Sequence, residues 1–192
     1  MTRVDIPATE EQIRQLKVGD EVEIYGTIVT ARDAAHKYMV EKWPKFVEPL
    51  LENGAIYHCG PVMTKERGKW KVVAAGPTTS TREEPYEGPV MEHYKVRVII
   101  GKGGMGEKTL AACKKVGAIY LHAVGGAAVS LAESIKRVRE VHMLDEFGVP
   151  EAFWVCDVEG FRGVVTMDAS GKSIHKTILR KSQKARKFLL DL

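Results

Sequence analysis

The most constraining feature of the sequence is a glycine-rich loop between an apolar strand and a helix. The segment "VRVIIGKGGMGEKTL", residues 96–110, is mostly apolar up to Ile100, then holds four glycines within six residues before a helical pattern begins. A strand that turns through glycines into a helix is typical of α/β folds, which bind ligands at the carboxyl ends of their strands. The loop therefore predicts an α/β fold and a candidate ligand site.

The glycine loop does not by itself predict a nucleotide site. Gly101, Gly103 and Gly106 match the spacing of the dinucleotide fingerprint, but the next strand, "AIYLHAV", ends without the acidic residue that binds a ribose. A P-loop needs a lysine after its last glycine, and Glu107 stands there. Amides at a helix N-terminus together with Lys102 favour a small anion instead, and a tight turn with an exposed lysine is the alternative.

Two other segments place cationic and hydroxyl side chains directly after apolar strands. The segment "GTIVTARDAAHK" puts Arg32 at a strand-to-helix junction, and "AAGPTTSTREEPY" puts Thr78, Ser80 and Arg82 after another strand. A guanidinium binds a carboxylate through two parallel hydrogen bonds, and a turn with hydroxyls and free amides forms an anion cradle. If Arg32, Arg82 and Lys102 meet at one sheet edge, they suit a small dicarboxylate.

The order of elements is β-rich up to about residue 76 and alternates between strands and helices after the glycine loop. Apolar periodicity and turn residues predict helices over 10–16, 31–43, 107–116 and 127–140, with a helical tail over 174–192. The predicted strands are 21–30, 55–63, 69–77, 95–100, 118–124, 151–158 and 163–168. Thr9 and Gln12 have the spacing of a capping box at the first helix, and Pro44 stops the second.

The three cysteines do not predict a disulfide framework or a metal cluster. Cys59, Cys113 and Cys156 are an odd number without CxxC spacing, which suits a reducing cytoplasm. Cys113 is expected inside a helix and Cys156 inside a strand, where cysteine is commonly a small buried apolar residue. We therefore expect this chain to bind no cofactor or metal of its own.

Charge is concentrated at the end of the chain. Residues 172–192 hold seven basic residues and one acid, so that residues 1–171 carry a net charge of −2 within a total of +4. This pattern predicts a solvated or partner-docking helix and no nucleic-acid partner. The longest uncharged stretch, residues 117–132, is shorter than the roughly 20 residues that span a bilayer, and no leader is visible, so we expect a cytoplasmic protein with no membrane association.

Four separated segments, in order, resemble the C-terminal domain or β subunit of the iron–sulfur class I fumarases and the related L-tartrate dehydratase β subunits. They are "GTIVTARDAAHK", "GPTTSTR", "GKGGM" and "YLHAVGGAA", and "EVHMLDEFGVPEAFWVCDVEGF" continues the likeness over about residues 5–170. The resemblance implies a swivelling β/β/α domain over residues 1–171, followed by a basic helical tail over 172–192.

The resemblance also implies an activity and a partner. Enzymes of this family interconvert fumarate and malate, with a [4Fe-4S] cluster held by three cysteines on an N-terminal domain or a separate α subunit. This chain is similar to the β half alone, so the resemblance implies that it acts only with a fumarase α subunit, in an α2β2 assembly. Its own cysteines match none of the family's cluster ligands, so the cluster is expected on the partner.

Site roles follow from the same resemblance. It implies that Arg32, Arg82 and Lys102 bind substrate, with Lys102 at the reacting centre, and that Thr78 lies nearest the proton removed from carbon. These residue types suit the chemistry, because removing a proton beside a carboxylate creates a dianion that fixed cations stabilise. An unassisted hydroxyl is a poor base, so Thr78 either passes the proton to a partner carboxylate or only orients the substrate.

Several alternatives stay open. The segment "YLHAVGGAA" is more similar to fumarases than to tartrate dehydratases, which favours fumarate, but an L-tartrate dehydratase β subunit or a non-catalytic dicarboxylate-binding module would use the same residues. Asp33 and His36 either stabilise the helix that follows Arg32 or orient that arginine. His122 either lines the site or packs against it.

Overall fold

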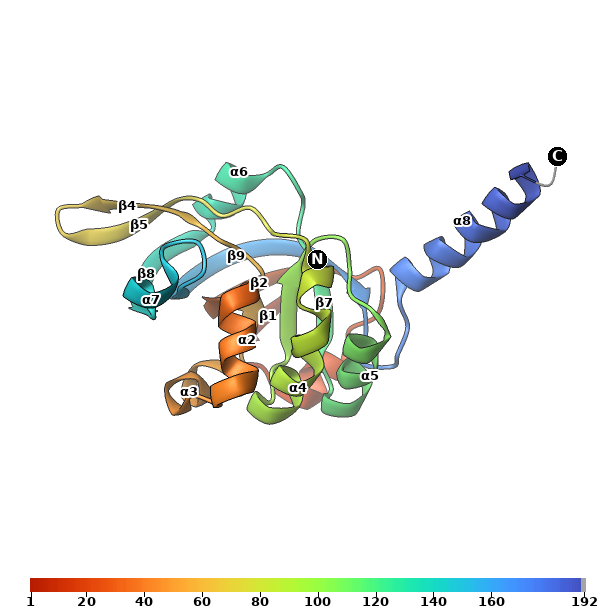
Figure 1. Ribbon diagram of the computed structural model, residues 1–192, viewed down its shortest axis with the longest axis horizontal. Coiled ribbons are helices and arrows are strands. Elements are labelled where there is room, and N and C mark those ends of the chain that lie inside the picture. Colours follow the sequence, from red (N-terminus) through yellow and green to blue (C-terminus); the bar gives the residue numbers. More distant parts are fainter. Residues whose placement is uncertain (191–192) are drawn as a thin grey trace.

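The computed structural model describes residues 1–190 and contains a mixed sheet that closes on itself (Figure 1). The ring is formed by β2 (Glu21–Thr30), β3 (Ala55–Tyr57), β6 (Val98–Gly101), β7 (Ile119–His122) and β9 (Phe153–Met167). The first four pair in parallel in this order, and β9 pairs antiparallel with both β7 and β2, which completes a five-stranded barrel. β1 (Thr2–Ile6) extends the sheet beside β2, and β8 (Ile135–His142) extends it beside β9.

Helices α2, α4 and α5 lie side by side on one face of the parallel strands, as Figure 1 shows. The helices are α1 (Glu10–Gln15), α2 (Asp33–Lys42), α3 (Glu48–Leu51), α4 (Glu84–Tyr94), α5 (Glu107–Val116), α6 (Ala128–Glu133), α7 (Leu144–Phe147) and α8 (Ile174–Leu190), with short 3-10 turns at Lys45–Val47 and Ser80–Arg82. A hairpin of β4 (Val62–Glu66) and β5 (Lys69–Ala74) extends to one side, and α8 projects from the opposite side.

The parallel strands are buried on both faces, which leaves only their ends for polar chemistry. Tyr57, Ile100 and Leu121 pack inside the barrel, whereas their neighbours Ile56 and Ile99 pack against the helices. Burial on both faces explains why these strands read as continuous apolar runs rather than as alternating patterns. Side chains that act at a site must therefore lie in the loops that follow these strands.

The predicted capping features at the first two helices are confirmed. Thr9 and Gln12 form a reciprocal capping box at the start of α1. α2 ends at Trp43, which adopts a left-handed conformation (φ 47°) directly before Pro44. The α/β class and the alternation of strands and helices after the glycine loop are also confirmed, but helices alternate with strands in the first part as well.

The prediction of one helix over 127–140 is wrong. Only α6, Ala128–Glu133, is helical, and the rest forms β8. The prediction rested on the helical spacing of Leu131, Ile135 and Val138. Within β8, apolar residues continue at intervals of three, at Ile135, Val138 and Val141. In the structure, two irregularities in the pairing of β8 with β9 shift its register, so that these three side chains all pack against the barrel core.

Other boundaries differ from the sequence prediction in smaller ways. The two strands expected over 151–168 are one bent strand, β9, and the strand expected over 55–63 divides into β3 and β4. α4 was not predicted, because it contains Gly88 and Pro89. α8 covers Ile174–Leu190 of the predicted helical tail, and residues 191–192 lie outside the described residues.

Within residues 1–190, none of the helices combines the length and apolar character needed to cross a bilayer.

Candidate functional site

Two of the segments singled out in the sequence, those of Arg32 and Lys102, meet the loop of His58 at one edge of the barrel. Arg32 follows β2, His58 follows β3 and Lys102 follows β6, and these strands are parallel neighbours. The carboxyl ends of parallel strands lie at the same edge of a sheet, so the three following loops are brought together. The last residue of β7, His122, pairs with Gly101 at the same edge.

The segment that contains Thr78 and Arg82 is inserted between the ends of β3 and β6. The amide of Thr78 donates to the carbonyl of His58 (2.7 Å), and the amide of Ser80 donates to the carbonyl of Lys102 (3.0 Å). These two bonds fix the backbone of the segment against both neighbouring loops. The segment of Thr78 and Arg82 therefore contacts the loop of Lys102 directly. It reaches the neighbourhood of Arg32 through the loop of His58, which follows the strand next to β2.

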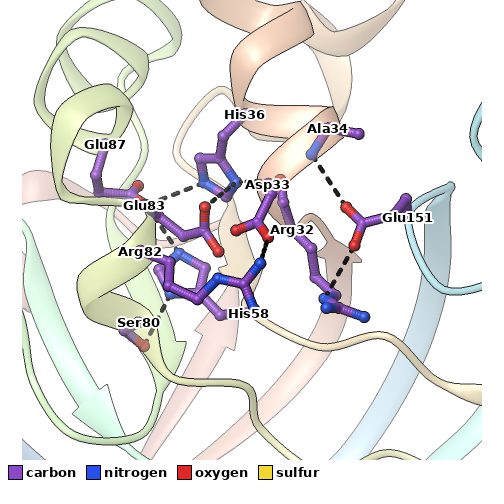
Figure 2. A network of polar contacts seen from close by, with 10 residues as sticks. All are labelled: Arg32, Asp33, Ala34, His36, His58, Ser80, Arg82, Glu83, Glu87 and Glu151. Atoms are coloured by element: carbon purple, nitrogen blue, oxygen red, sulfur yellow. Dashed lines mark hydrogen bonds and ion pairs between the residues drawn. The ribbon is translucent and has the colours of Figure 1, made fainter.

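Arg32 is the second residue beyond β2 and occupies the N-cap position of α2 (Figure 2). Its side chain is 22% exposed, and its Nε lies 3.3 Å from Oε1 of Glu151, whose other oxygen accepts from the amide of Ala34 (3.0 Å). Gly60 lies against the guanidinium, since an added Cβ would sit 2.5 Å from Nη1. The arginine is thus held along its Nε edge by a carboxylate and confined by bare backbone at Nη1.

Arg82 points back toward α2. Its Nη2 contacts Oδ2 of Asp33, the first residue of that helix, in an ion pair between side chains that are 56% and 33% exposed. Figure 2 shows the Arg32 and Arg82 side chains on either side of Asp33. Both arginines therefore already hold a carboxylate of this chain, which is the group that a guanidinium recognises best.

Lys102 lies in the glycine loop, half-buried, with its backbone bridged to Thr79. Gly125, in the loop after β7, borders its side chain, because an added Cβ there would sit 3.5 Å from Cδ of Lys102. The absence of a side chain at Gly125 leaves room along the lysine. Contact of Lys102 with a substrate stays a prediction, as it does for Arg32, Arg82 and Thr78.

The expectation that the helix after the glycine loop binds an external anion is wrong. The N-terminus of α5 is filled by the carboxylate of Glu84, which accepts from the amides of Gly106 (2.7 Å), Lys108 (2.9 Å) and Thr109 (3.3 Å) and from the hydroxyl of Thr109 (2.7 Å). The positive end of the helix dipole is therefore satisfied within the chain. The glycine loop connects β6 to α5 and carries Lys102. The amides of Gly106, Lys108 and Thr109 at the start of α5 are bonded to Glu84 of α4 and are not free for a phosphate.

The expected anion cradle around Thr78 to Ser80 is also wrong in part. The amides of Thr78 and Ser80 are bonded to backbone carbonyls, and the hydroxyl of Ser80 is buried. That hydroxyl lies 2.9 Å from Nδ1 of His58 and 2.8 Å from the hydroxyl of Tyr120. Anion recognition at this edge must therefore come from side chains, mainly the two arginines and the lysine.

A buried polar network lies directly beneath the site; we call it the His–Glu network and define it as His36, His58, Glu87, Ser80 and Tyr120. Oε2 of Glu87 lies 3.0 Å from Nε2 of His36 and 2.8 Å from Nε2 of His58. Nδ1 of His36 lies 2.9 Å from the carbonyl oxygen of Arg32. Figure 2 shows the two imidazoles converging on the carboxylate of α4. His36 is therefore a buried, hydrogen-bonded group that contacts the backbone of Arg32.

Charge in the His–Glu network is divided unequally. Burial alone would raise the pKa of Glu87, but the two histidines lower it to about 2. Burial disfavours charge on His36, yet the adjacent Glu87 carboxylate raises the pKa of His36, whereas burial keeps the pKa of His58 below its ordinary value. Burial also raises the pKa of Glu83, one turn earlier on α4. Two buried glutamates four residues apart thus have pKa values shifted in opposite directions.

Metal binding by the His–Glu network does not fit its geometry. The ligand atoms of His36, His58 and Glu87 lie within 4.8 Å of one another, a set of residue types that suits zinc. However, the two nitrogen–oxygen separations, 2.8 Å and 3.0 Å, are hydrogen-bond lengths. Tetrahedral zinc with bonds of about 2.0–2.2 Å holds its ligands about 3.3–3.6 Å apart. The three side chains are already partners of one another.

The cysteines of this chain do not fit an iron–sulfur cluster. Cys59 and Cys156 lie in the core inside the barrel, and Cys113 lies in the separate core between the sheet and the helices. All three are buried, and burial raises the pKa of each thiol, to about 12 for Cys59 and Cys156. Buried, protonated thiols in two different cores cannot act together as thiolate ligands.

Sequence reasoning missed the acidic half of the site. Glu84, Glu87 and Glu151 each hold a residue near the strand ends, and none was singled out. Their signal was weak: Glu83, Glu84 and Glu87 lie at helical spacing in "REEPYEGP", but the prolines and glycine of that segment are typical of a loop. Pro85 at the first turn is compatible with a helix start, because its missing amide has no partner there anyway.

Comparison with known proteins adds the family. A family model described as "Fumarase C-terminus" matches residues 1–178. The chain is 54% identical over 178 residues to a protein from Geobacillus stearothermophilus named "Putative fumarate hydratase class I", covering 92% of this chain but 34% of that protein. It is 40% identical to a protein from Methanocaldococcus jannaschii named "Putative L(+)-tartrate dehydratase subunit beta", covering 96% of each chain. It is 38% identical to the L(+)-tartrate dehydratase subunit beta of Escherichia coli, covering 88% of this chain and 83% of that one.

Proposed function

The chain belongs to the fumarase C-terminus family, and from this we propose that it is the β subunit of a class I fumarase-type iron–sulfur hydro-lyase. Its reaction would be the reversible hydration of fumarate to malate, carried out in the cytoplasm with an α subunit in an α2β2 assembly. The chain spans about a third of the length of the Geobacillus relative. The assignment as a β subunit is supported by two relatives that are named as β subunits and of which the chain covers most.

The observation that carries this proposal is the pair of arginines at one sheet edge. Arg32 and Arg82 each hold a carboxylate, Glu151 and Asp33 respectively, from loops that converge on the same place. A dicarboxylate needs two such cationic groups at neighbouring positions. We assign Arg32 and Arg82 one substrate carboxylate each, with the substrate carboxylate at Arg82 replacing Asp33.

The roles of Lys102 and Thr78 follow from the charge that the reaction creates. Removal of a proton beside a carboxylate concentrates negative charge on that carboxylate, so a fixed cation close to it lowers the barrier. We assign this role to Lys102, whose backbone is held beside the Thr78 segment. We assign to Thr78 the role of receiving the proton or orienting the substrate, and as a base it needs a carboxylate from the partner to accept the proton.

The [4Fe-4S] cluster of this family is assigned to the partner. The buried thiols of Cys59, Cys113 and Cys156 do not fit a cluster, so in this proposal the α subunit holds it. The contributions of this chain are to bind the two carboxylates, to orient the substrate and to take part in the proton transfer at Thr78.

The substrate assignment rests on local sequence. The relative with 54% identity is named as a fumarate hydratase, and "YLHAVGGAA" is more similar to the fumarase version of this stretch. L-Tartrate is the second candidate, because the relatives named as tartrate dehydratase β subunits match this chain over nearly their whole length. We also propose that residues 1–171 form a swivelling domain and that residues 172–192 form a separate basic tail.

Reconstitution with an α subunit tests the proposal. The complex, supplied with iron and sulfide under anaerobic conditions, should convert malate to fumarate faster than it dehydrates tartrate, whereas the isolated chain should show neither iron–sulfur absorbance nor activity. Activity from the isolated chain would contradict the shared site. Tight dicarboxylate binding by the isolated chain, with no partner and no catalysis, would favour a binding module.

A further inference from the structure

The His–Glu network contacts the backbone of every loop that carries a proposed site residue. His36 reaches the carbonyl of Arg32, and Ser80 lies between Thr78 and Arg82. Gly101, directly before Lys102, packs on the same network: an added Cβ there would overlap Oγ of Ser80 and sit 2.9 Å from the hydroxyl of Tyr120. A single buried assembly thus lies beneath all three loops.

The hydrogen bonds of the network fit one consistent proton arrangement. A carbonyl oxygen only accepts, so His36 donates from Nδ1 to Arg32, and its Nε2 donates to the ionised Glu87. His36 therefore carries both ring protons and is a cation. His58 donates from Nε2 to the same carboxylate oxygen and accepts at Nδ1 from Ser80, which in turn accepts from Tyr120. The network holds one cation and one anion.

We propose that Glu87, together with His36 and His58, is a positioning unit that does not touch substrate. It fixes the relative positions of three loops: those of Arg32, of Thr78 to Arg82 and of Lys102. This inference rests on the proposed function for its catalytic consequence, but the positioning itself can be measured in the isolated chain. Glu87 links the loops through its two partners: His36 contacts the carbonyl of Arg32, and His58 contacts Ser80 of the Thr78 to Arg82 segment. Gly101, directly before Lys102, packs on Ser80.

Stability alone does not account for this network. A buried ion pair loses hydration on folding, and apolar side chains of similar volume often stabilise a protein at least as well. His36, His58 and Glu87 are fully buried, next to a core of apolar residues. What apolar replacements would remove is the set of directed bonds to Arg32 and Ser80.

Glu83 provides a matched control on the same helix. It lies one turn before Glu87 and is equally buried, but neither of its oxygens has a hydrogen-bond partner among the described residues, and Oε2 is 4.0 Å from Nδ1 of His36. The charged and titratable groups that face His36 are therefore Glu87 and Glu83 of α4 and His58 after β3, with Arg82 and Glu151 beyond Glu83.

The test compares Glu87→Gln with Glu83→Gln in the full 192-residue chain by NMR. In wild type and in Glu83→Gln, the nitrogen shifts of His36 should report a doubly protonated ring at neutral pH. In Glu87→Gln, His36 should become neutral, and the backbone amides of Arg32, Thr78 and Lys102 should all shift. If Glu87→Gln leaves those three amides and the charge of His36 unchanged, or if Glu83→Gln moves them equally, the positioning unit is refuted.

Kinetics of the reconstituted complex give a second readout. Glu87→Gln should reduce kcat/KM about tenfold or more, with both kcat and KM affected, while Glu83→Gln should stay within about twofold of wild type. Glu87→Asp, which keeps the charge, should recover part of the loss. Equal losses in both Gln variants would contradict positioning by Glu87.

Two outcomes need a separate variant or a separate measurement. If Glu87→Gln does not fold, Ser80→Ala replaces it, because that change removes one hydroxyl and leaves the pair of His36 and Glu87 intact. It should shift the amides of Thr78 and Lys102 but not that of Arg32, and a shift confined to residue 80 and its chain neighbours would refute the link. If the wild-type complex is inactive on both substrates, the proposed function fails, and the amide shifts alone decide the positioning.

Discussion

The N-termini of α2 and α5 both receive a glutamate from elsewhere in the chain, but they differ in what that glutamate leaves free. At α5, Glu84 accepts from three amides and one hydroxyl. At α2, Glu151 accepts from one amide and pairs with Arg32 only along its Nε edge. The glycine-rich loop therefore leads to a helix terminus whose amides are bonded to Glu84. The loop before α2, which has no glycine signature, leads to Arg32, which Glu151 pairs only along its Nε edge.

This difference shows that a glycine-rich motif typical of anion binding can lead to backbone amides that another residue of the same chain already bonds. The amides of Gly106, Lys108 and Thr109 bind Glu84 of α4, and in the proposed site the glycine loop contributes only Lys102. At α2, by contrast, the helix terminus and the side chain of Arg32 act together on one carboxylate. Four predictions test this contrast, in order of decreasing expected effect.

Lys102→Ala should have the largest effect on turnover, because it removes the cation that we assign to stabilising the negative charge on the substrate. In the reconstituted complex, kcat should fall by about a hundredfold to a thousandfold, in line with losses seen when one charge-stabilising group is removed from an active site. Lys108→Ala, an exposed lysine on α5 of the same chain, is the matched control and should leave kcat unchanged. An unchanged kcat in Lys102→Ala would remove the lysine from the site.

Glu84→Ala tests whether the α5 terminus is closed by this one carboxylate. Leaving its four donors without a partner should lower the free energy of unfolding by about 3 kcal/mol, measured by urea denaturation. The control is Glu107→Ala on the first turn of the same helix, whose carboxylate is 70% exposed and contacts Lys176. That change should cost less than about 1 kcal/mol. Similar losses in the two variants would contradict the special role of Glu84.

Acid should loosen α2 before α5, because only α2 rests on the ionised Glu87. The folded-state pKa of Glu87 is lowered to about 2 from an ordinary value of 4.5, so its contribution to stability is present above pH 4.5 and is lost as the pH falls toward 2. Hydrogen exchange should show the opening free energy of the α2 amides decreasing over this range, and Glu87→Gln should abolish that decrease. A parallel decrease in α2 and α5 that persists in Glu87→Gln would oppose the account.

Glu151→Gln should have the smallest effect, since the amide oxygen of glutamine can still accept from Ala34. Loss of the charge along the Nε edge of Arg32 should raise KM about twofold to fivefold with little change in kcat. Glu146→Gln, an exposed acid on α7, serves as the control. A fall in KM would instead mean that Glu151 competes with the substrate for Arg32.

The sequence predicted the cationic half of the site because each cation follows an apolar strand. Parallel strands end at one edge, so recognition of the strands before Arg32 and Lys102 was enough to place both loops there. Arg82 and Thr78 follow β5, which belongs to the separate hairpin, and reach the edge through the insertion of their segment between β3 and β6. Their convergence was expected because they too follow an apolar strand, and the resemblance implied it as well, but β5 is not a strand of the barrel.

The acidic half was not predictable for physical reasons. Glu84 meets the α5 terminus across more than twenty residues, and Glu87 meets His36 and His58 from a helix that its own prolines and glycine conceal. Such pairings are set by how α2, α4 and α5 pack, which a single sequence does not specify. β8 was missed for a different reason, because bulges let a spacing of three residues face one side of a strand.

The most direct test of the central claim is a crystal structure of the reconstituted complex with malate bound. The account predicts that one carboxylate of malate lies within hydrogen-bond distance of Arg32 and the other within that distance of Arg82, with Lys102 beside the carbon that loses its proton and Glu84 still bonded to the α5 amides. Malate bound away from these three cations, or bound at the α5 terminus in place of Glu84, would contradict it.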